Sequence, residues 1–307
     1  MTMGRSSAFK SGIVALAGKP NVGKSSLLNA LLDYKLAIVS DKPQTTRTSI
    51  RGVLNRPGLQ LIICDTPGLH LPRHALGRAI VSNAETALEA SDVVCLVIDG
   101  TDRDIDAEDR EVVGKILKAA RPVILAVNKM DLVKNSDALK RLVSQYNEVC
   151  PAVETAYISA RTRSNLDTLV DVIARRLDDS SPTYDEDVLT DRPERFLASE
   201  LIREKVLKLT EEEVPHSVAV EIEEYKSPDE YPERNVLYIR AALLVERPGQ
   251  KGILLGEKGN RIREIGRLAR LDIESMTGHK VFLELWVKVR PKWRQSEDAV
   301  RRLGLKE

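Results

Sequence analysis

Short apolar runs rich in β-branched residues recur along the first half of this 307-residue chain, separated by stretches with helical spacing of apolar positions. Runs of this kind are typical of buried strands. The strand candidates begin near Gly12, Ile50, Gln60, Val93, Pro122 and Thr155. Because strands and helices alternate, residues 10–178 are predicted to form an α/β domain with a mostly parallel sheet covered by helices.

A different pattern follows a polar, acidic, proline-containing stretch, which is predicted to be a linker over residues 179–193. Beyond it come a helix candidate, two strands with alternating apolar positions, two helices joined by a tight turn within 251–272, and a last strand over 281–289. Residues 194–307 are therefore expected to form a second, α+β domain. The first residues, 1–9, are expected to be a flexible N-terminus.

A glycine-bounded loop lies between the first predicted strand and the first predicted helix, where residues 18–25 read Gly-Lys-Pro-Asn-Val-Gly-Lys-Ser. Backbone N–H groups at a helix start have no partner within the helix, so they can bind phosphate oxygens, and glycines allow close approach. Lys24 is expected to reach the β- and γ-phosphates, and Ser25 to place its hydroxyl on Mg²⁺. The residues predicted to bind nucleotide here are Gly18, Lys19, Pro20, Asn21, Val22, Gly23, Lys24, Ser25 and Ser26.

A second short motif, Asp-Thr-Pro-Gly, closes the strand candidate that begins near Gln60. Its Asp is expected to bind Mg²⁺, directly or through water. The N–H of its Gly is expected to sense the γ-phosphate, so that hydrolysis would release the segment that follows. The nucleotide-binding residues predicted here are Asp65, Thr66, Pro67 and Gly68.

The polar stretch over residues 43–48 lies between these two motifs and is expected to be the other switch segment. Thr46 is predicted to be a further Mg²⁺ ligand, with Thr45 as the competing choice. Arg47 is expected to face solvent, and a charge-supplying role is its alternative. An ordinary polar loop is the alternative interpretation of the whole stretch.

The motif Asn-Lys-Met-Asp over residues 128–131 selects the base. Guanine offers two adjacent donors, N1–H and the exocyclic amine, and the carboxylate of Asp131 can accept both, whereas adenine offers no such pair. Sites built on polar pairing reject the wrong base strongly. Asn128 is expected to tie loops together, and the stem of Lys129 to cover the base. The base-binding residues predicted are Asn128, Lys129, Met130 and Asp131, with Ser159, Ala160 and Arg161 near guanine O6.

The turn Gly-Glu-Lys-Gly over residues 256–259 joins two short helices in the second domain and resembles the clamp of a KH domain, which binds single-stranded nucleic acid. Between Lys251 and Arg294, 11 Lys or Arg stand against 5 Asp or Glu, as expected for a nucleic-acid surface. Glu257 opposes this charge, and a plain helix-turn-helix element is the alternative. The predicted RNA-binding residues are Lys251, Gly252, Gly256, Glu257, Lys258, Gly259, Arg261 and Arg263.

Taken together, the motifs at 18–25, 43–47, 65–70 and 128–131 and the second domain resemble the translation-factor class of P-loop GTPases, and within it the Era-type GTPases. The resemblance covers nearly the whole chain. It implies a type II KH domain, binding of GTP and GDP with Mg²⁺, and slow basal GTP hydrolysis. It further implies binding near the 3′ end of small-subunit ribosomal RNA and a role in assembly of the 30S particle.

The residue after the Asp-Thr-Pro-Gly motif is Leu69, which cannot orient water as the Gln of Ras-like enzymes does. Similar GTPases with an apolar residue there use K⁺, associated with the Asn of the phosphate loop, and Asn21 has that place. The resemblance therefore implies K⁺ as a second candidate cofactor. The residues assigned to catalysis are Lys24, Thr46, Asn21 and Gly68.

Bulk properties restrict the remaining possibilities. A formal net charge of +1 implies no partner by itself, and Cys64, Cys95 and Cys150 show no metal or disulfide spacing, which suits a reducing cytoplasm. No signal peptide, spanning segment or lipidation motif is seen, and a monomer is expected. Peripheral association with the inner face of the cell membrane is left open.

The alternative function is a membrane-recruited signalling or cell-cycle GTPase whose second domain binds protein. An ATP-using enzyme is disfavoured by Asp131.

Overall fold

The computed structural model describes residues 9–42, 44–68, 74–230 and 235–306. Residues 1–8, expected to be flexible, lie outside this description, as do Pro43 and Leu69. The chain folds into two compact units. The first comprises Met1–Ala37, Thr46–Pro72 and Ile80–Asp191, and the second comprises Ile38–Thr45, Arg73–Ala79 and Arg192–Glu307.

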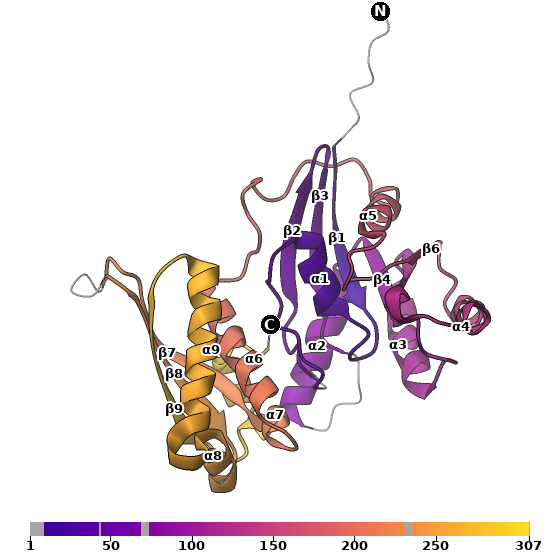
Figure 1. Ribbon diagram of the computed structural model, residues 1–307. Coiled ribbons are helices and arrows are strands. Elements are labelled where there is room, and N and C mark those ends of the chain that lie inside the picture. Colours follow the sequence, from indigo (N-terminus) through magenta and orange to yellow (C-terminus); the bar gives the residue numbers. More distant parts are fainter. Residues whose placement is uncertain (1–8, 43, 69–73, 231–234, 307) are drawn as a thin grey trace, which may run out of the picture. The chain divides into compact units, whose positions relative to one another are not determined.

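A six-stranded sheet forms the centre of the first unit, in the order β2-β3-β1-β4-β5-β6 (Figure 1). All neighbouring strands are parallel except β2, which runs antiparallel to β3. This confirms the predicted, mostly parallel sheet. Since parallel strands end at one edge of a sheet, the loops after β1, β3, β4 and β5 gather there. The strands are β1 (Lys10–Ala17), β2 (Ile50–Arg56), β3 (Leu59–Asp65), β4 (Val93–Asp99), β5 (Val123–Asn128) and β6 (Glu154–Tyr157).

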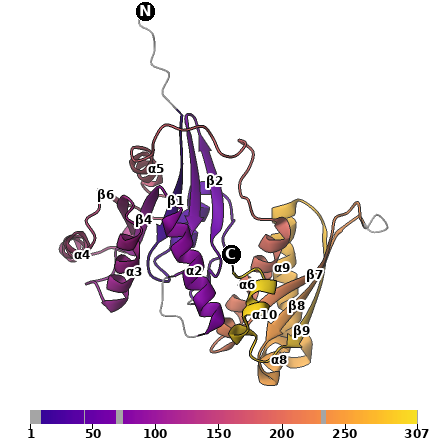
Figure 2. The same cartoon turned by 180° about the vertical axis from the view of Figure 1, so that it is seen from behind.

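Helices cover both faces of this sheet, as comparison of Figures 1 and 2 shows. On one face, side chains of α2, α3 and α4 pack against β1, β4 and β5 in a buried cluster that includes Leu88, Val112 and Leu142. On the other face lie α1 and α5. The helices are α1 (Lys24–Leu32), α2 (Ala75–Glu89), α3 (Ala107–Lys118), α4 (Ser136–Val149) and α5 (Leu166–Ala174), with a short 3-10 turn at Met130–Leu132.

The segment predicted to be a linker is hydrogen-bonded to the first unit as far as Asp191. Gln60 of β3 is fully buried, and its Oε1 accepts from the backbone N–H groups of Thr183 at 2.7 Å and Tyr184 at 3.0 Å. Its Nε2 donates to the carbonyl of Tyr184 at 2.8 Å. The N–H of Val53 on the edge strand β2 donates to the carbonyl of Leu189 at 2.9 Å. The segment therefore covers an edge that would otherwise present unpaired backbone groups.

A three-stranded sheet and two long helices, α6 and α9, make up most of the second unit. Strand β7 is antiparallel to β8, and β9 is parallel to β8. Apolar residues such as Ile202, Leu243 and Ile273 form its core. The predicted order of helix, two strands, two helices and strand is confirmed. The elements are α6 (Glu194–Leu209), α7 (Val214–Ser217), β7 (Ala219–Lys226), β8 (Leu237–Val245), α8 (Pro248–Leu255), a 3-10 turn (Glu257–Gly259), α9 (Asn260–Thr277), β9 (Val281–Val289), a 3-10 turn (Trp293–Gln295) and α10 (Glu297–Arg302).

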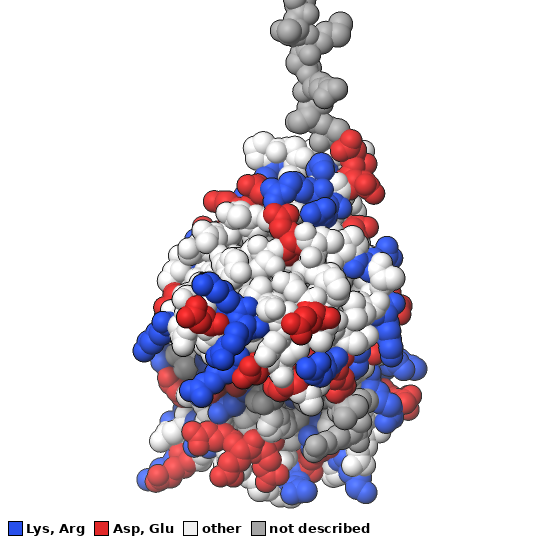
Figure 3. All heavy atoms as spheres, turned by 90° about the vertical axis from the view of Figure 1, so that its right-hand side faces the viewer, with Lys and Arg blue, Asp and Glu red and all other residues white. Residues whose placement is uncertain are grey.

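The surface carries charges of both signs. On the face shown in Figure 3, Lys and Arg side chains are interspersed with Asp and Glu side chains and separated by uncharged residues. This mixture agrees with the formal net charge of +1. Among the described residues, no helix combines the length and the apolar character that crossing a membrane would require.

Candidate functional site

The loop between β1 and α1 has a shape that only glycine permits at two positions. Gly18 has φ +147°, and a Cβ there would lie 2.2 Å from the carbonyl oxygen of Val97. Gly23 has φ +100°, and a Cβ there would lie 2.4 Å from Nδ2 of Asn128. The loop is therefore pressed against β4 and β5, and its backbone leads directly into the N-terminus of α1.

Lys24, the first residue of α1, is buried inside this loop. Its Nζ donates to the carbonyl oxygens of Gly18 and Lys19, both at 2.8 Å. Burial lowers the pKa of Lys24 to about 8, although the negative charges of Asp65 and Glu108 oppose the shift. The ammonium is thus held at the mouth of the loop, where it can bind a phosphate as a point charge.

Three oxygen-bearing side chains meet beside this loop. Ser25 Oγ lies 2.6 Å from Asp65 Oδ2 and 3.1 Å from Thr46 Oγ1, and Thr46 Oγ1 lies 3.3 Å from Asp65 Oδ2. Asp65 is fully buried, burial raises its pKa, and its Oδ1 has no hydrogen-bond partner among the described residues. A buried carboxylate with an unused oxygen beside two hydroxyls suits Mg²⁺, a hard cation that prefers oxygen ligands.

Thr45 and Thr46, the two candidate Mg²⁺ ligands of the switch segment, make different side-chain contacts. Thr46 contacts Ser25 and Asp65, whereas Thr45 Oγ1 donates to the carbonyl of Lys42 at 2.6 Å. The hydroxyl of Thr66 is turned away from the site and donates to the carbonyl of Leu16 at 2.7 Å. The geometry therefore favours Thr46 over Thr45.

Four further residues of the nucleotide loops can be located. Gly68 lies against Pro20, since a Cβ on Gly68 would be 3.1 Å from Cγ of that proline. Asn21 adopts a left-handed backbone with φ 64°. Arg47 is only 1% exposed, so the expectation that it faces solvent is wrong.

Asn128, at the end of β5, connects two loops that are far apart in sequence. Its Nδ2 donates to the carbonyl of Val22 in the phosphate loop at 2.9 Å. Its Oδ1 accepts from the N–H of Ala160 at 2.9 Å. Asn128 is 2% exposed, and one amide side chain thereby holds the phosphate loop and the loop over residues 159–161 together.

The carboxylate of Asp131 lies within hydrogen-bonding distance of the loop after β6. Its Oδ1 accepts from Ser159 Oγ at 2.6 Å, and its Oδ2 is paired with Arg161. The hydrogen bond from Ser159 lowers the pKa of Asp131, and the charge of Arg161 adds to this effect. The group is therefore held as an anion, the form that accepts two hydrogen bonds.

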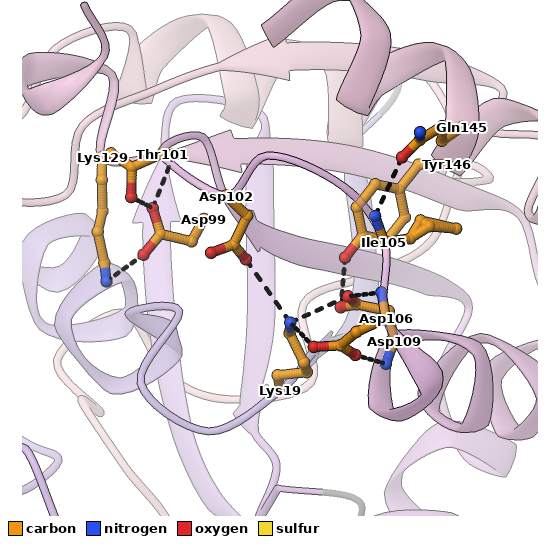
Figure 4. A network of polar contacts seen from close by, with 10 residues as sticks. All are labelled: Lys19, Asp99, Thr101, Asp102, Ile105, Asp106, Asp109, Lys129, Gln145 and Tyr146. Carbon is orange, nitrogen blue, oxygen red and sulfur yellow. Dashed lines mark hydrogen bonds and ion pairs between the residues drawn. The ribbon is translucent and has the colours of Figure 1, made fainter. Parts of the chain in front are cut away.

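Asp99 is a site residue that the sequence interpretation missed. Its Oδ2 is paired with Lys129 Nζ at 2.5 Å, and its Oδ1 accepts from the N–H and the hydroxyl of Thr101 (Figure 4). The pair fixes the stem of Lys129, the side chain predicted to cover the base. An acidic residue at the carboxyl end of a predicted strand was the signal that could have found it.

The second unit presents the Gly-Glu-Lys-Gly turn between α8 and α9. Gly256 has φ +68°, and a Cβ there would lie 2.7 Å from Cβ of Arg261, so the turn requires glycine. Arg261 Nη1 donates to the carbonyl of Ile253 at 2.6 Å, and Arg263 donates to the carbonyl of Lys258. Glu257 and Lys258 are exposed. Two arginines are therefore hydrogen-bonded to the backbone around the turn, and Lys258 lies at the surface.

A groove of about 360 Å³ runs beside this turn, between α9 and β9. Apolar side chains and arginines line it together, a combination that suits stacked bases and phosphates. Of its residues, only Arg263 was predicted to bind RNA. The spacing of Arg263, Arg267 and Arg270 along one helix was the signal that could have found the other two arginines. The groove is lined by Ile262, Arg263, Gly266, Arg267, Arg270, Leu283 and Leu285.

Comparison with family models agrees with this division of the chain. A model described as 50S ribosome-binding GTPase matches residues 13–129, and a model of the KH domain matches residues 213–294. The first match contains the phosphate loop, and the second contains the Gly-Glu-Lys-Gly turn and the groove.

Relatives match almost the entire chain. It is 44% identical over 300 residues to GTPase Era of Heliobacterium modesticaldum. The aligned region covers 97% of this chain and 98% of that relative. The chain is 43% identical over 302 residues to GTPase Era of Leuconostoc citreum, in an alignment that covers 98% of each.

Two solved structures of Era match with a TM-score of 0.92 and 41% identity, and each covers 97% of this chain and 100% of the solved one. One is an Era variant from Aquifex aeolicus bound to GDP·AlF4⁻. The other is Era in complex with MgGDPNP and nucleotides 1506–1542 of 16S ribosomal RNA. With the nucleotide loops and the KH turn in place, these matches show that the chain belongs to the Era family of GTPases.

Proposed function

We propose that this chain is a GTP-hydrolysing switch that binds single-stranded RNA near the 3′ end of small-subunit ribosomal RNA and assists assembly of the 30S particle. The observation that carries the proposal is the arginine-lined groove beside the Gly-Glu-Lys-Gly turn, on the same chain as a guanine-nucleotide site. A related Era, solved with MgGDPNP and a fragment of 16S ribosomal RNA, supports it.

In the proposed nucleotide site, Asp131 accepts the two donors of guanine, and Lys24 binds the β- and γ-phosphates. Arg161, which pairs with Asp131 Oδ2 in this structure, must give up that contact when the base binds. Ser25, Thr46 and Asp65 would hold Mg²⁺, which would supply positive charge to the phosphates. The close contact between Gly68 and Pro20 supports a role for the Gly68 N–H near the γ-phosphate.

Potassium is part of the proposal for hydrolysis. We assign Asn21 to K⁺, because it is the Asn of the phosphate loop and the residue after the Asp-Thr-Pro-Gly motif is Leu69, which cannot orient water. Single-turnover GTP hydrolysis, measured in K⁺ and in Na⁺ for the natural chain and for Asn21→Ala, tests the assignment. Faster hydrolysis in K⁺ that the variant loses is expected. Equal rates in all four reactions would reject it.

The RNA clamp is tested with a matched pair of glycine variants. Gly259 and Gly278 flank the two ends of α9 with φ +77° and φ +70°. Gly259→Asp places a carboxylate in the proposed clamp, whereas Gly278→Asp places one at the far end of the same helix. With an oligonucleotide of the 16S ribosomal RNA 3′ end, Gly259→Asp should weaken binding at least tenfold and leave GDP affinity intact. Equal RNA binding by both variants would contradict the clamp.

We further propose a cytoplasmic monomer. A membrane-recruited GTPase whose second domain binds protein is not favoured, since the relatives are named GTPase Era and one was solved with ribosomal RNA. Co-sedimentation with anionic phospholipid vesicles, in parallel with RNA retention on filters, separates the two functions. Sedimentation velocity of the full chain tests the monomer.

A further inference from the structure

The side chain of Lys19 in the phosphate loop points into an acidic cluster at the start of α3 (Figure 4). The acidic cluster consists of Asp102, Asp106 and Asp109. Lys19 Nζ lies 2.9 Å from Asp109 Oδ2, 3.1 Å from Asp106 Oδ2 and 3.6 Å from Asp102 Oδ2. The Lys19 side chain is only 14% exposed. One ammonium thus faces three carboxylates, of which that of Asp109 is buried and those of Asp102 and Asp106 are 38% and 57% exposed.

The acidic cluster is held in place by other bonds. Asp106 Oδ1 accepts from the N–H of Asp109, and Asp109 Oδ2 accepts from the N–H of Asp106, both at 2.9 Å, which forms the capping box of α3. Asp109 is 3% exposed, and its Oδ1 accepts from the hydroxyl of Tyr146 on α4. Burial and this bond raise the pKa of Tyr146, so it stays a neutral donor. The carboxylates of Asp106 and Asp109 therefore cannot turn away if Lys19 is removed.

The backbone of Lys19 lies on the nucleotide side. Its carbonyl oxygen accepts from Lys24 Nζ at 2.8 Å, so this single residue contacts both the acidic cluster and the phosphate-binding lysine. Charged groups of α3 also act on Lys24. The negative charge of Glu108, in the first turn of α3, acts to raise the pKa of Lys24. Because Lys24 is buried, water screens this interaction less than it screens a pair of charges at the surface.

We propose that Lys19 is a positioning residue that serves as the counter-ion of the acidic cluster and so prevents its negative charge from opposing the phosphates of a bound guanine nucleotide. Burial by itself lowers the pKa of Lys19, but hydrogen bonds to Asp109 and Asp106 outweigh it and raise the pKa, so the ammonium is charged at every physiological pH. The proposal rests on the nucleotide site described above. It assigns to this lysine an electrostatic role in place of direct contact with nucleotide.

Replacement of Lys19 by Met keeps much of the stem and removes the charge. Three carboxylates, of which that of Asp109 is buried, are then left without a counter-ion beside the phosphate loop, and their repulsion of the ligand grows with the charge of the ligand. The affinity of Lys19→Met for each nucleotide is measured by displacement of a fluorescent GDP analogue by GMP, GDP and GTP at one Mg²⁺ concentration. The affinity for GMP should fall about threefold, that for GDP about tenfold, and that for GTP about thirtyfold. If Lys19 only supports the fold, its replacement by Met should weaken the binding of GMP, GDP and GTP by the same factor.

Charge rescue completes the test. Combination of Lys19→Met with Asp102→Asn and Asp106→Asn removes two of the uncompensated charges, and asparagine still caps a helix. This triple variant should recover most of the GTP affinity, and Lys19→Arg should retain it. Asp102→Asn with Asp106→Asn in the natural background should bind GTP more tightly, a result that can be obtained even if Lys19→Met does not fold.

The outcomes separate this inference from the nucleotide site itself. If the natural chain binds no guanine nucleotide, the site assignment fails. If it binds GDP and GTP but Lys19→Met weakens GMP, GDP and GTP by the same factor, or the triple variant shows no recovery, only the counter-ion role is overturned. Unchanged GTP affinity in the Asp102→Asn, Asp106→Asn variant would overturn it as well.

Discussion

Ser159 Oγ donates a hydrogen bond to Asp131 Oδ1 across 2.6 Å. The same hydroxyl accepts from the N–H of Thr162 at 3.1 Å, so the serine both orients the carboxylate and is itself oriented by its loop. A carboxylate held in this way needs little reorganisation to accept the two donors of guanine. The proposed selection of guanine by Asp131 therefore involves Ser159, a residue of a different loop.

The first prediction concerns this serine. Ser159→Ala removes the hydrogen bond that lowers the pKa of Asp131, so the carboxylate loses both its orientation and part of its stabilisation as an anion. Hydrogen bonds to charged groups contribute about 1.5–3 kcal/mol, and we expect GDP affinity to fall at least tenfold. Titration calorimetry measures the loss. Ser164→Ala, a change in the same exposed loop, is the control and should bind GDP normally; equal affinities in both variants would contradict the role.

A pH dependence follows from Lys24. Burial lowers its pKa to about 8, and bound phosphates favour the protonated form, so nucleotide binding near pH 8 should take up about half a proton. At pH 6 the lysine is already protonated and contributes no uptake. Calorimetric enthalpies of GDP binding in buffers of different ionisation enthalpy reveal the proton count. EDTA is included so that Mg²⁺ does not displace a proton from Asp65, whose pKa burial raises. Equal proton counts at the two pH values would refute the shift.

Gln60 supplies a prediction about the segment that covers β2. Gln60→Leu removes three hydrogen bonds to Thr183 and Tyr184 and leaves their backbone groups without those partners. The loss should lower the free energy of unfolding by about 2 kcal/mol. It should also speed amide hydrogen exchange at these two residues, since local opening becomes easier. Gln295→Leu, an exposed site in the second unit, is the control; unchanged exchange at Thr183 would show that other contacts hold the segment.

The groove beside the KH turn can be filled without touching a cation. Gly266 lines it, and a Cβ there would meet Leu285 Cδ1 at 3.5 Å, an ordinary contact. Gly266→Leu should therefore fold, and leucine favours the helix over glycine by roughly 0.8 kcal/mol. Its side chain should occupy the groove and weaken binding of the 16S ribosomal RNA 3′-end oligonucleotide about tenfold. Gly249→Leu in α8, where a Cβ meets nothing, is the matched control. Equal RNA binding by both variants would place the RNA elsewhere.

Much of the fold followed from local pattern. Apolar runs predicted the strands of the first unit because a strand buried on both faces needs uninterrupted apolar residues. Asp65 and Asn128 follow such runs, and the parallel arrangement of β3 and β5 brings both to one edge of the sheet. Motif order was thus enough to predict which loops form the nucleotide site.

Other parts depended on contacts between distant segments. Polarity alone predicted an exposed Arg47, but the folded chain buries it. An apolar run placed Gln60 at the start of a strand and could not show that its amide binds residues 183–184, because that partner is more than 120 positions away. The groove between α9 and β9 likewise exists only after the helix packs on the sheet.

The amino-acid sequence by itself determined the phosphate-loop motif, the Asn-Lys-Met-Asp motif with its proposed base-selecting carboxylate, and the Gly-Glu-Lys-Gly turn, since each is a short run whose chemistry is local. The tertiary structure alone decided that Lys19, a residue inside the phosphate loop, directs its ammonium to Asp109 on α3. Spacing along a chain records which residues are neighbours in sequence, whereas the direction of a long side chain depends on which charges the fold brings within a few ångströms of it.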